Sequence, residues 1–225
     1  MTRSTFDEVM AAGRAAVLSG EHHAEAAPAE TGRWGPSVVF LPSGGLAASL
    51  DRLTHEAAAV LPGHWHSGAT GAAHVTVRAL EPYADGSLGS DRAVRYRAAL
   101  ASAADGLGAV QLNFEGLVLS VGTVMAWATN PDGRADELRR RFAAELGADG
   151  WLEDTAFKTG RDPIWYSSLL HFAGPIESPA NAVEWVDARR DTAIGEQSFE
   201  SAALCRWEFD ARCMLPSIIG AVPLT

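Results

Sequence analysis

The 225-residue chain carries 18 Lys and Arg residues against 28 Asp and Glu residues, a formal net charge of −10, and 47% of its residues are hydrophobic. That apolar content is enough for a packed core in one large domain or two small ones. An acidic surface repels polyanions at long range, so the composition argues against long nucleic acids and anionic bilayers as partners.

No apolar run approaches the roughly 20 residues that cross a bilayer. The first residues also lack the basic-then-apolar pattern of a signal peptide, so we expect a cytoplasmic protein without membrane contact. The two cysteines, Cys205 and Cys213, show no CxxC spacing. Two reduced thiols are favoured over a disulfide across a hairpin in a chain so poor in cysteine.

Helical and strand-like patterns alternate along the first half of the chain. An amphipathic helix is expected over 4–18, and the polar, Ala/Pro/Gly-rich segment that follows indicates a mobile linker. The next expected elements are a strand at 37–42, a helix over about 46–60 ended by Pro62 and Gly63, a strand at 73–80 and a helix over about 91–105.

The second half is expected to begin with a hairpin and to end with further strands. The expected elements are strands at 109–120 and 122–129, a helix at 131–147, a strand at 164–174, a helix at 178–190 and closing strands at 196–210 and 212–219. This order favours an α+β fold with a mostly antiparallel, strongly bent sheet. Residues 1–35 are expected to form an N-terminal helix and linker, and 36–225 a single domain.

The strand "AHVTVRAL" at 73–80 has a polar face. Alternation places His74, Thr76 and Arg78 on one side and the apolar residues between them on the other. A histidine exchanges protons near neutral pH, and a hydroxyl about 6–7 Å along the strand can hold a phosphoryl oxygen. A solvent-exposed face is the plain alternative, but two such units facing each other would form a metal-independent phosphodiesterase site.

A second unit of this kind is found in "DPIWYSSLLHFAGPI" at 162–176. Tyr166 and Ser168 share one face of the expected strand, and Tyr166 stands where a second histidine would be needed. His171 falls on the other face by alternation, and only a bulge would bring it round. We therefore expect His171 to be a core or supporting histidine.

These motifs are similar to those of the 2H phosphoesterase superfamily, which includes the 2′-5′ RNA ligase-like proteins and cyclic phosphodiesterases. The similarity covers roughly residues 36–216, where "HVTV" at 74–77 fits the family's H-x-(T/S)-hydrophobic motif and "YSSL" at 166–169 fits it except at its first residue. The resemblance implies two lobes of bent, mostly antiparallel sheets with helices on the outer faces around a central cleft. It implies an acid/base role for His74, phosphate contacts for Thr76 and Ser168, and no metal or cofactor.

The tyrosine at position 166 changes what the resemblance implies. With an ordinary pKa of about 10, a tyrosine donates a proton but is a poor base at neutral pH. His74 as base and Tyr166 as acid would preserve one direction of a phosphodiesterase reaction on a small cyclic phosphate or nucleotide. Two alternatives stay open: a degenerate protein that binds a nucleotide or small anion without hydrolysis, and non-phosphate acid/base chemistry in specialised metabolism.

Further residues are candidates for binding a small anionic substrate. Trp65 and His66 could line the rim of the site, and Arg78, Lys158 and Arg161 could meet the anion, with solvated loop residues as the alternative interpretation. The HxH pair of His64 and His66 has metal-ligand spacing, but no third ligand stands at a persuasive distance, so we expect no metal.

Overall fold

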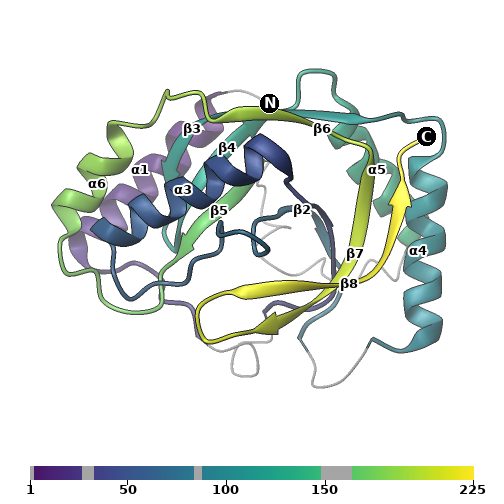
Figure 1. Ribbon diagram of the computed structural model, residues 1–225, viewed down its shortest axis with the longest axis horizontal. Helices are drawn as coiled ribbons and strands as arrows, with labels where there is room; N and C mark the ends of the chain where they lie inside the picture. The colour runs from purple at the N-terminus through teal and green to yellow at the C-terminus, as the bar shows by residue number, and fades with distance from the viewer. Residues whose placement is uncertain (1–2, 27–32, 84–87, 148–163) are drawn as a thin grey trace.

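The computed structural model describes residues 3–26, 33–83, 88–147 and 164–225, which form two four-stranded antiparallel sheets surrounded by helices (Figure 1). The first sheet has the order β2 (Val75–Ala79), β1 (Ser37–Phe40), β7 (Ser201–Phe209) and β8 (Met214–Pro223). The second sheet has the order β5 (Trp165–His171), β4 (Thr123–Thr129), β3 (Val110–Leu119) and β6 (Gly195–Phe199). The expected α+β class with antiparallel sheets is confirmed.

The helices form two groups at opposite ends of the molecule (Figure 1). The group around the second sheet contains α1 (Arg3–Ser19), α3 (Gly44–Val60) and α6 (Pro179–Asp187). The other group contains α4 (Ser90–Ala104), which packs on β7 and β8, and α5 (Arg134–Leu146), which contacts α4, β2 and β3. Both sheets therefore have helices on their outer faces, as expected.

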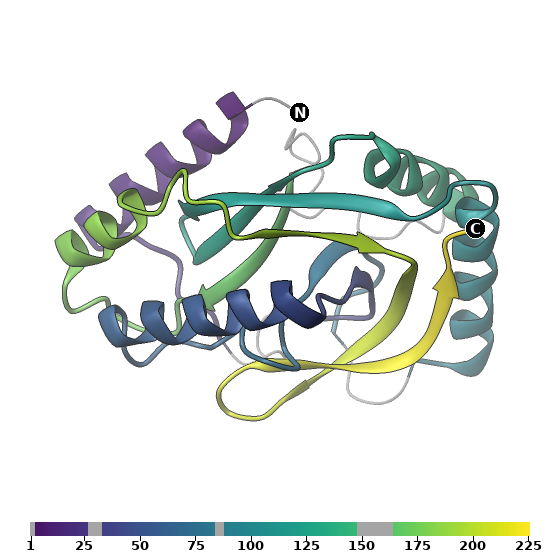
Figure 2. The same cartoon turned by 45° about the horizontal axis from the view of Figure 1, so that its top comes forward.

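The first sheet combines strands from both ends of the chain, whereas the second is built from the continuous segment between them. β1 and β2 pair within a sheet completed by β7 and β8, whereas β3 and β4 pair with β5 and β6. The chain passes from the second sheet into the first at Glu200, between β6 and β7, where the ribbon bends sharply (Figure 2). Because α1 and α3, which precede β3 in the chain, pack on the second sheet, the two sheets are parts of one structure.

The N-terminal helix packs into this structure through the apolar side of α1. Phe6, Met10 and Val17 are buried in the same core cluster as the sheet residues. At Gly13 the helix approaches β3 so closely that a Cβ atom would lie 2.1 Å from the carbonyl oxygen of Leu119. Of the expected linker, residues 27–32 lie outside the described part of the chain.

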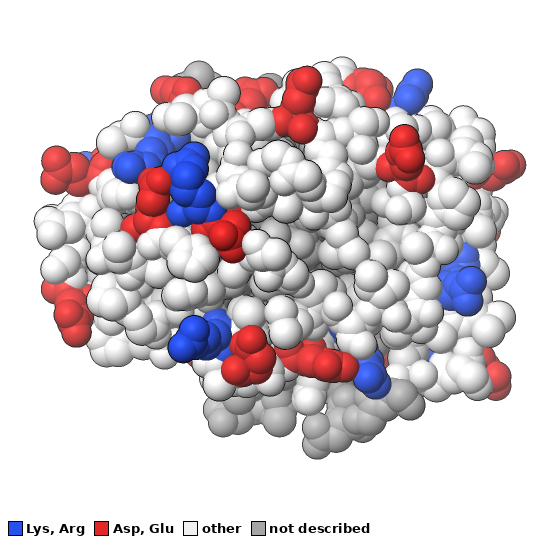
Figure 3. Space-filling model, viewed as in Figure 1, with Lys and Arg blue, Asp and Glu red and all other residues white. Residues whose placement is uncertain are grey.

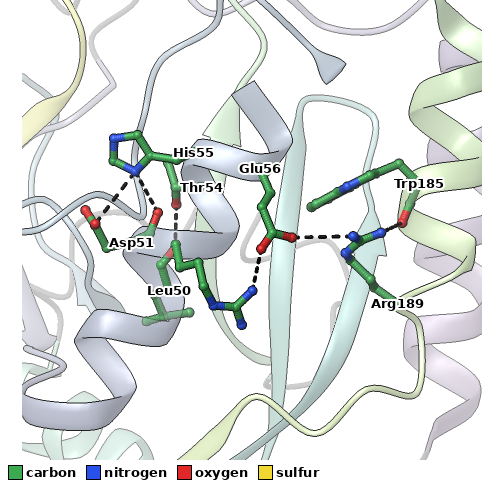
Figure 4. Close-up of polar contacts among 8 residues, drawn as sticks. Leu50, Asp51, Thr54, His55, Glu56, Trp185 and Arg189 are labelled. Carbon is green, nitrogen blue, oxygen red and sulfur yellow. Dashed lines mark hydrogen bonds and ion pairs between the residues drawn. The ribbon is translucent and has the colours of Figure 1, made fainter. Parts of the chain in front are cut away.

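Polar contacts join α3 to α6 on the surface (Figure 4). Arg189 lies 3.4 Å from the carboxylate of Glu56, donates to the carbonyl oxygen of Trp185 at 3.2 Å, and places its guanidinium 4.3 Å from that tryptophan's ring. Exposed ion pairs of this kind contribute about 0–1 kcal/mol, so buried apolar residues provide most of the stability here.

Charged side chains of both signs are scattered around the rim of one face, and its middle is uncharged (Figure 3). Ion pairs of the described residues include Arg14 with Asp187 and Arg190 with Asp7. Within the described ranges, no helix is long and apolar enough to cross a bilayer.

The two cysteines are both free, which confirms the prediction of reduced thiols. The pairing of β7 with β8 places Ile218, rather than Cys213, opposite Cys205. Burial raises the pKa of the Cys205 thiol to about 12 and that of the Cys213 thiol to about 11. Neither thiol is therefore an activated nucleophile.

Candidate functional site

The pairing of β1 with β2 decides which way the first motif faces. Thr76 lies opposite Val39 and Arg78 lies opposite Val38, with an irregularity between the two pairs. Residues directly opposite each other share a face, and successive residues of a strand point to opposite faces. The prediction that Arg78 shares a face with Thr76 was therefore wrong, because a bulge interrupts the alternation.

His74, directly before β2, lies on the same side as Thr76. Its ring centroid is 4.4 Å from that of Trp207, which belongs to a buried cluster that also contains Val39, the partner of Thr76. The predicted common face thus holds for His74 and Thr76, although His74 is only 8% exposed and Thr76 is half-buried.

A second bulge shapes the other motif strand. The pairs between β5 and β4 are Tyr166 with Trp127, Ser168 with Met125, Leu170 with Val124, and His171 with Thr123. Leu169 is the extra residue, so the register returns His171 to the face of Tyr166 and Ser168. The expectation that His171 faces away was wrong, because the pairing with β4 overrides simple alternation.

His74 and His171 are brought together around one indole ring. Trp34 packs edge-on against both imidazoles, with centroid distances of 6.1 Å to His74 and 4.9 Å to His171. We call the side of β2 and β5 that carries His74, Thr76, Tyr166, Ser168 and His171 the motif face. Sequence reasoning missed Trp34, because it lies in an irregular segment with no periodic signal.

A side-chain hydrogen bond of His74 shows which ring nitrogen carries the proton. Its Nδ1 lies 2.9 Å from the carbonyl oxygen of Ala72, and because a carbonyl only accepts, Nδ1 carries the proton of the neutral ring. Burial lowers the pKa of His74 to about 4, against a small opposing effect of the bond to Ala72. At neutral pH the Nε2 atom therefore has a lone pair that can accept a proton.

His171 is also neutral at physiological pH. Burial lowers the pKa of His171 well below its ordinary value, and the charge of Arg33, together with that of His74 when His74 is protonated, lowers it further. Its Nδ1 atom lies 2.5 Å from the hydroxyl oxygen of Ser67. Its backbone exchanges two hydrogen bonds of 3.0 Å with Trp65. The loop before β2 thus fixes both the ring and the backbone of His171.

Of the other predicted binding residues, Trp65 lies beside the motif face, in the buried cluster of Val39 and Trp207. Trp65 is buried with its ring 4.6 Å from that of Phe209, and the ring of His66 lies 6.0 Å from that of His55. His64 accepts a hydrogen bond from the backbone of Ala173, so the imidazoles of the HxH pair have different neighbours. Lys158 and Arg161 lie outside the described residues, and no metal-binding group of three His, Cys, Asp or Glu residues occurs within the described ones.

No protein-family model and no curated protein matches the sequence. Comparison of the structure with solved structures did give matches. The protein TT0787 of Thermus thermophilus is 15% identical over 84% of this chain and 97% of its own, with a TM-score of 0.60. A protein solved as a phosphoesterase is 14% identical over 85% of this chain and 98% of its own, with a TM-score of 0.54.

LigT of E. coli in its apo form is 10% identical over 85% of this chain and 98% of its own, with a TM-score of 0.56. LigT has also been solved with phosphate and with 3′-AMP. Because the sequence identities are this low, the structural matches establish a likeness of fold alone. The chain therefore has a LigT-like α+β fold.

Proposed function

We propose that the protein is a metal-independent phosphodiesterase that acts on a small cyclic phosphate or nucleotide. His74 is the general base, and Tyr166, in place of a second histidine, is the proton donor. The observation that supports this proposal is the contact of β2, which carries Thr76 and directly follows His74, with β5, which carries Tyr166 and Ser168.

The chemistry proposed for these groups is an attack of water on phosphorus. Nε2 of His74 takes a proton from the attacking water, and the hydroxyls of Thr76 and Ser168 donate hydrogen bonds to the phosphoryl oxygens. As the P–O bond to the leaving group breaks, the leaving oxygen takes the phenolic proton of Tyr166. Solvent then returns a proton to Tyr166 and removes one from His74, which restores the starting state.

The likeness to LigT supports a ligand that contains phosphate. LigT has been solved with phosphate and with 3′-AMP, and this chain covers 98% of it with a TM-score of 0.56 in the 3′-AMP structure. A small anion also agrees with the net charge of −10, because a long polyanion would meet repulsion over much of the surface.

A second candidate function is binding of a nucleotide or other small anion without hydrolysis. The observation that favours it is the packing of Trp34 on both imidazoles, which leaves His74 and His171 only 8% and 5% exposed. A His171 that is uncharged at neutral pH is also a poor substitute for the missing acid.

Turnover of 2′,3′-cyclic nucleotides by a set of variants tests the proposal. His74→Ala should lose about 10²–10⁴ in rate, the usual effect of removing a general acid or base. Tyr166→Phe should lose rate with little change in unfolding free energy, because the ring remains. Tyr166→His should create or raise activity, since it restores the two-histidine pattern.

His171→Asn and the surface variant His55→Asn complete the set. If Tyr166→Phe keeps full activity while His171→Asn loses it, His171 rather than Tyr166 is the second catalytic group. If the wild type binds the nucleotide in calorimetry but turns none over, and Tyr166→His stays inactive, the binding function replaces the enzymatic one. His55→Asn should match the wild type throughout, because its side chain is 63% exposed on α3.

A further inference from the structure

The two motif strands belong to different sheets, and Arg139 joins them. β2 ends the first sheet and β5 ends the second, so each offers an edge to the other. Arg139 of α5 donates from Nε to the carbonyl oxygen of Val77 at 2.9 Å and from Nη2 to that of Thr76 at 3.0 Å. Its guanidinium also lies 3.7 Å from the ring centroid of Trp165, the first residue of β5.

The bulge in β2 makes this double contact possible. Consecutive carbonyls of a regular strand point to opposite edges, so one side chain does not normally reach both. The register shift between Val38 and Val39 leaves Val77 as the extra residue of β2, and its carbonyl accepts from the same guanidinium as that of Thr76. The irregularity that turns Arg78 away thus also creates the binding site for Arg139.

Trp165 is held from a second side by the same helix. Its Nε1 donates to Oδ1 of Asp136 at 2.7 Å, and its side chain is fully buried. Asp136 and Arg139 are therefore the two groups of α5 that hold the first residue of β5. Since Trp165 precedes Tyr166 and Thr76 belongs to the first motif, the contacts of Arg139 adjoin both motifs.

The chemistry of these contacts requires a guanidinium. Burial lowers the pKa of Arg139 to about 10, against the opposing effect of Asp136, so the group stays charged at neutral pH. A planar guanidinium donates in two fixed directions while its face stacks on an indole, and a lysine ammonium cannot do both.

We propose that Arg139 is a positioning residue that fixes β2 against β5 and thereby sets the separation of His74 and Thr76 from Tyr166 and Ser168. This inference rests on the proposed function for its catalytic consequence. It goes beyond that function by assigning the alignment of the site to a residue of α5 that holds the backbone of β2 and the indole of Trp165. A displacement of about 1 Å in such a site can cost about 10²-fold in rate.

The test compares Arg139→Lys and Arg139→Met with Arg140→Met, a matched control on the same helix whose exposed side chain pairs with Glu137. For 2′,3′-cyclic nucleotides, both Arg139 variants should lose about 10–100-fold in kcat with KM changed by less than about threefold, because bound substrate meets misaligned groups. Methylguanidinium at millimolar concentration should restore part of the kcat of an Arg139→Ala variant. Arg140→Met should match the wild type.

Amide hydrogen exchange makes the test independent of activity. Exchange in β2 and at the start of β5 should be faster in Arg139→Met than in Arg140→Met, while the β3–β4 hairpin stays protected in both. If the wild type is active and Arg139→Met keeps its kcat, the positioning role is overturned and the proposed function stands. If the wild type hydrolyses no phosphodiester, the proposed function fails. Hydrogen exchange in β2 and β5 that is the same in Arg139→Met as in Arg140→Met would overturn the positioning role.

Discussion

His74 should make the folded protein less stable in mild acid by an amount that the structure sets. Burial lowers the pKa of His74 from its ordinary 6.5 to about 4. Between these values the unfolded chain binds a proton that the folded chain does not, so the unfolding free energy falls as the pH falls. The stabilisation is complete above pH 6.5 and is lost progressively as the pH drops toward 4.

The size of the effect follows from the difference between the two pKa values. At about 1.4 kcal/mol per pKa unit, the loss reaches about 3 kcal/mol below pH 4 and is about 2 kcal/mol at pH 5. His74→Asn should remove this loss, because an asparagine amide can still donate to the carbonyl of Ala72 but does not titrate.

Urea denaturation of the wild type and His74→Asn at pH 8, 7, 6 and 5 provides the measurement. The difference in unfolding free energy at pH 8 is the baseline, and by pH 5 it should shift by about 2 kcal/mol in favour of the variant. Carboxylates and the other histidines titrate in both proteins and largely cancel. Parallel stability curves over this range would refute the reasoning, since His74 would then have the same proton affinity in the folded and unfolded chains.

Three further outcomes are expected. Gly13→Ala should lower the unfolding free energy by about 1–3 kcal/mol, because the added Cβ atom would lie 2.1 Å from a backbone oxygen of β3. Gly45→Ala, whose Cβ atom would have nothing within 4 Å, should raise the unfolding free energy by about 0.4–1 kcal/mol. Urea denaturation measures both changes, and equal effects would contradict the packing of α1 on β3. Turnover of cyclic nucleotides should survive millimolar EDTA, because hydroxyls and an imidazole are proposed to hold the phosphate. A loss of turnover in EDTA that a divalent cation restores would show that the reaction needs a metal. The acid limb of kcat/KM should lie below pH 6.5, because His74 takes up its proton only toward pH 4; a limb at or above 6.5 would show that another group is the base.

The sequence predicted the elements of this fold well, because periodic apolar residues report directly on helix and strand faces. Each expected helix and strand occurs within a few residues of its expected bounds, apart from the interruption of the closing strand at 196–210 by Glu200. The α+β architecture that the resemblance of "HVTV" and "YSSL" implies, with antiparallel sheets and helices around them, is likewise present.

The site was predictable only in part, because bulges depend on the partner strand. Alternation placed Arg78 with Thr76 and turned His171 away, and the pairings with β1 and β4 reverse both. No pattern within "AHVTVRAL" or "YSSLLH" marks the extra residue. Trp34 and Arg139 were missed for a related reason, since an irregular segment and a helix rich in arginine give no hint of which side chain reaches the motifs.

The origin of the first sheet from both ends of the chain has a consequence for synthesis. β1 needs β7 as its inner neighbour, and Val39 pairs with Ala203, so the first sheet cannot close until nearly the whole chain has been made. At about 5–20 residues per second, β1 and β2 wait roughly 8–30 s after translation of β1 with an apolar edge uncovered. The first half of the chain cannot complete its sheet before β7 is made, so the nascent protein should depend on chaperones more than a chain of two sequential domains would.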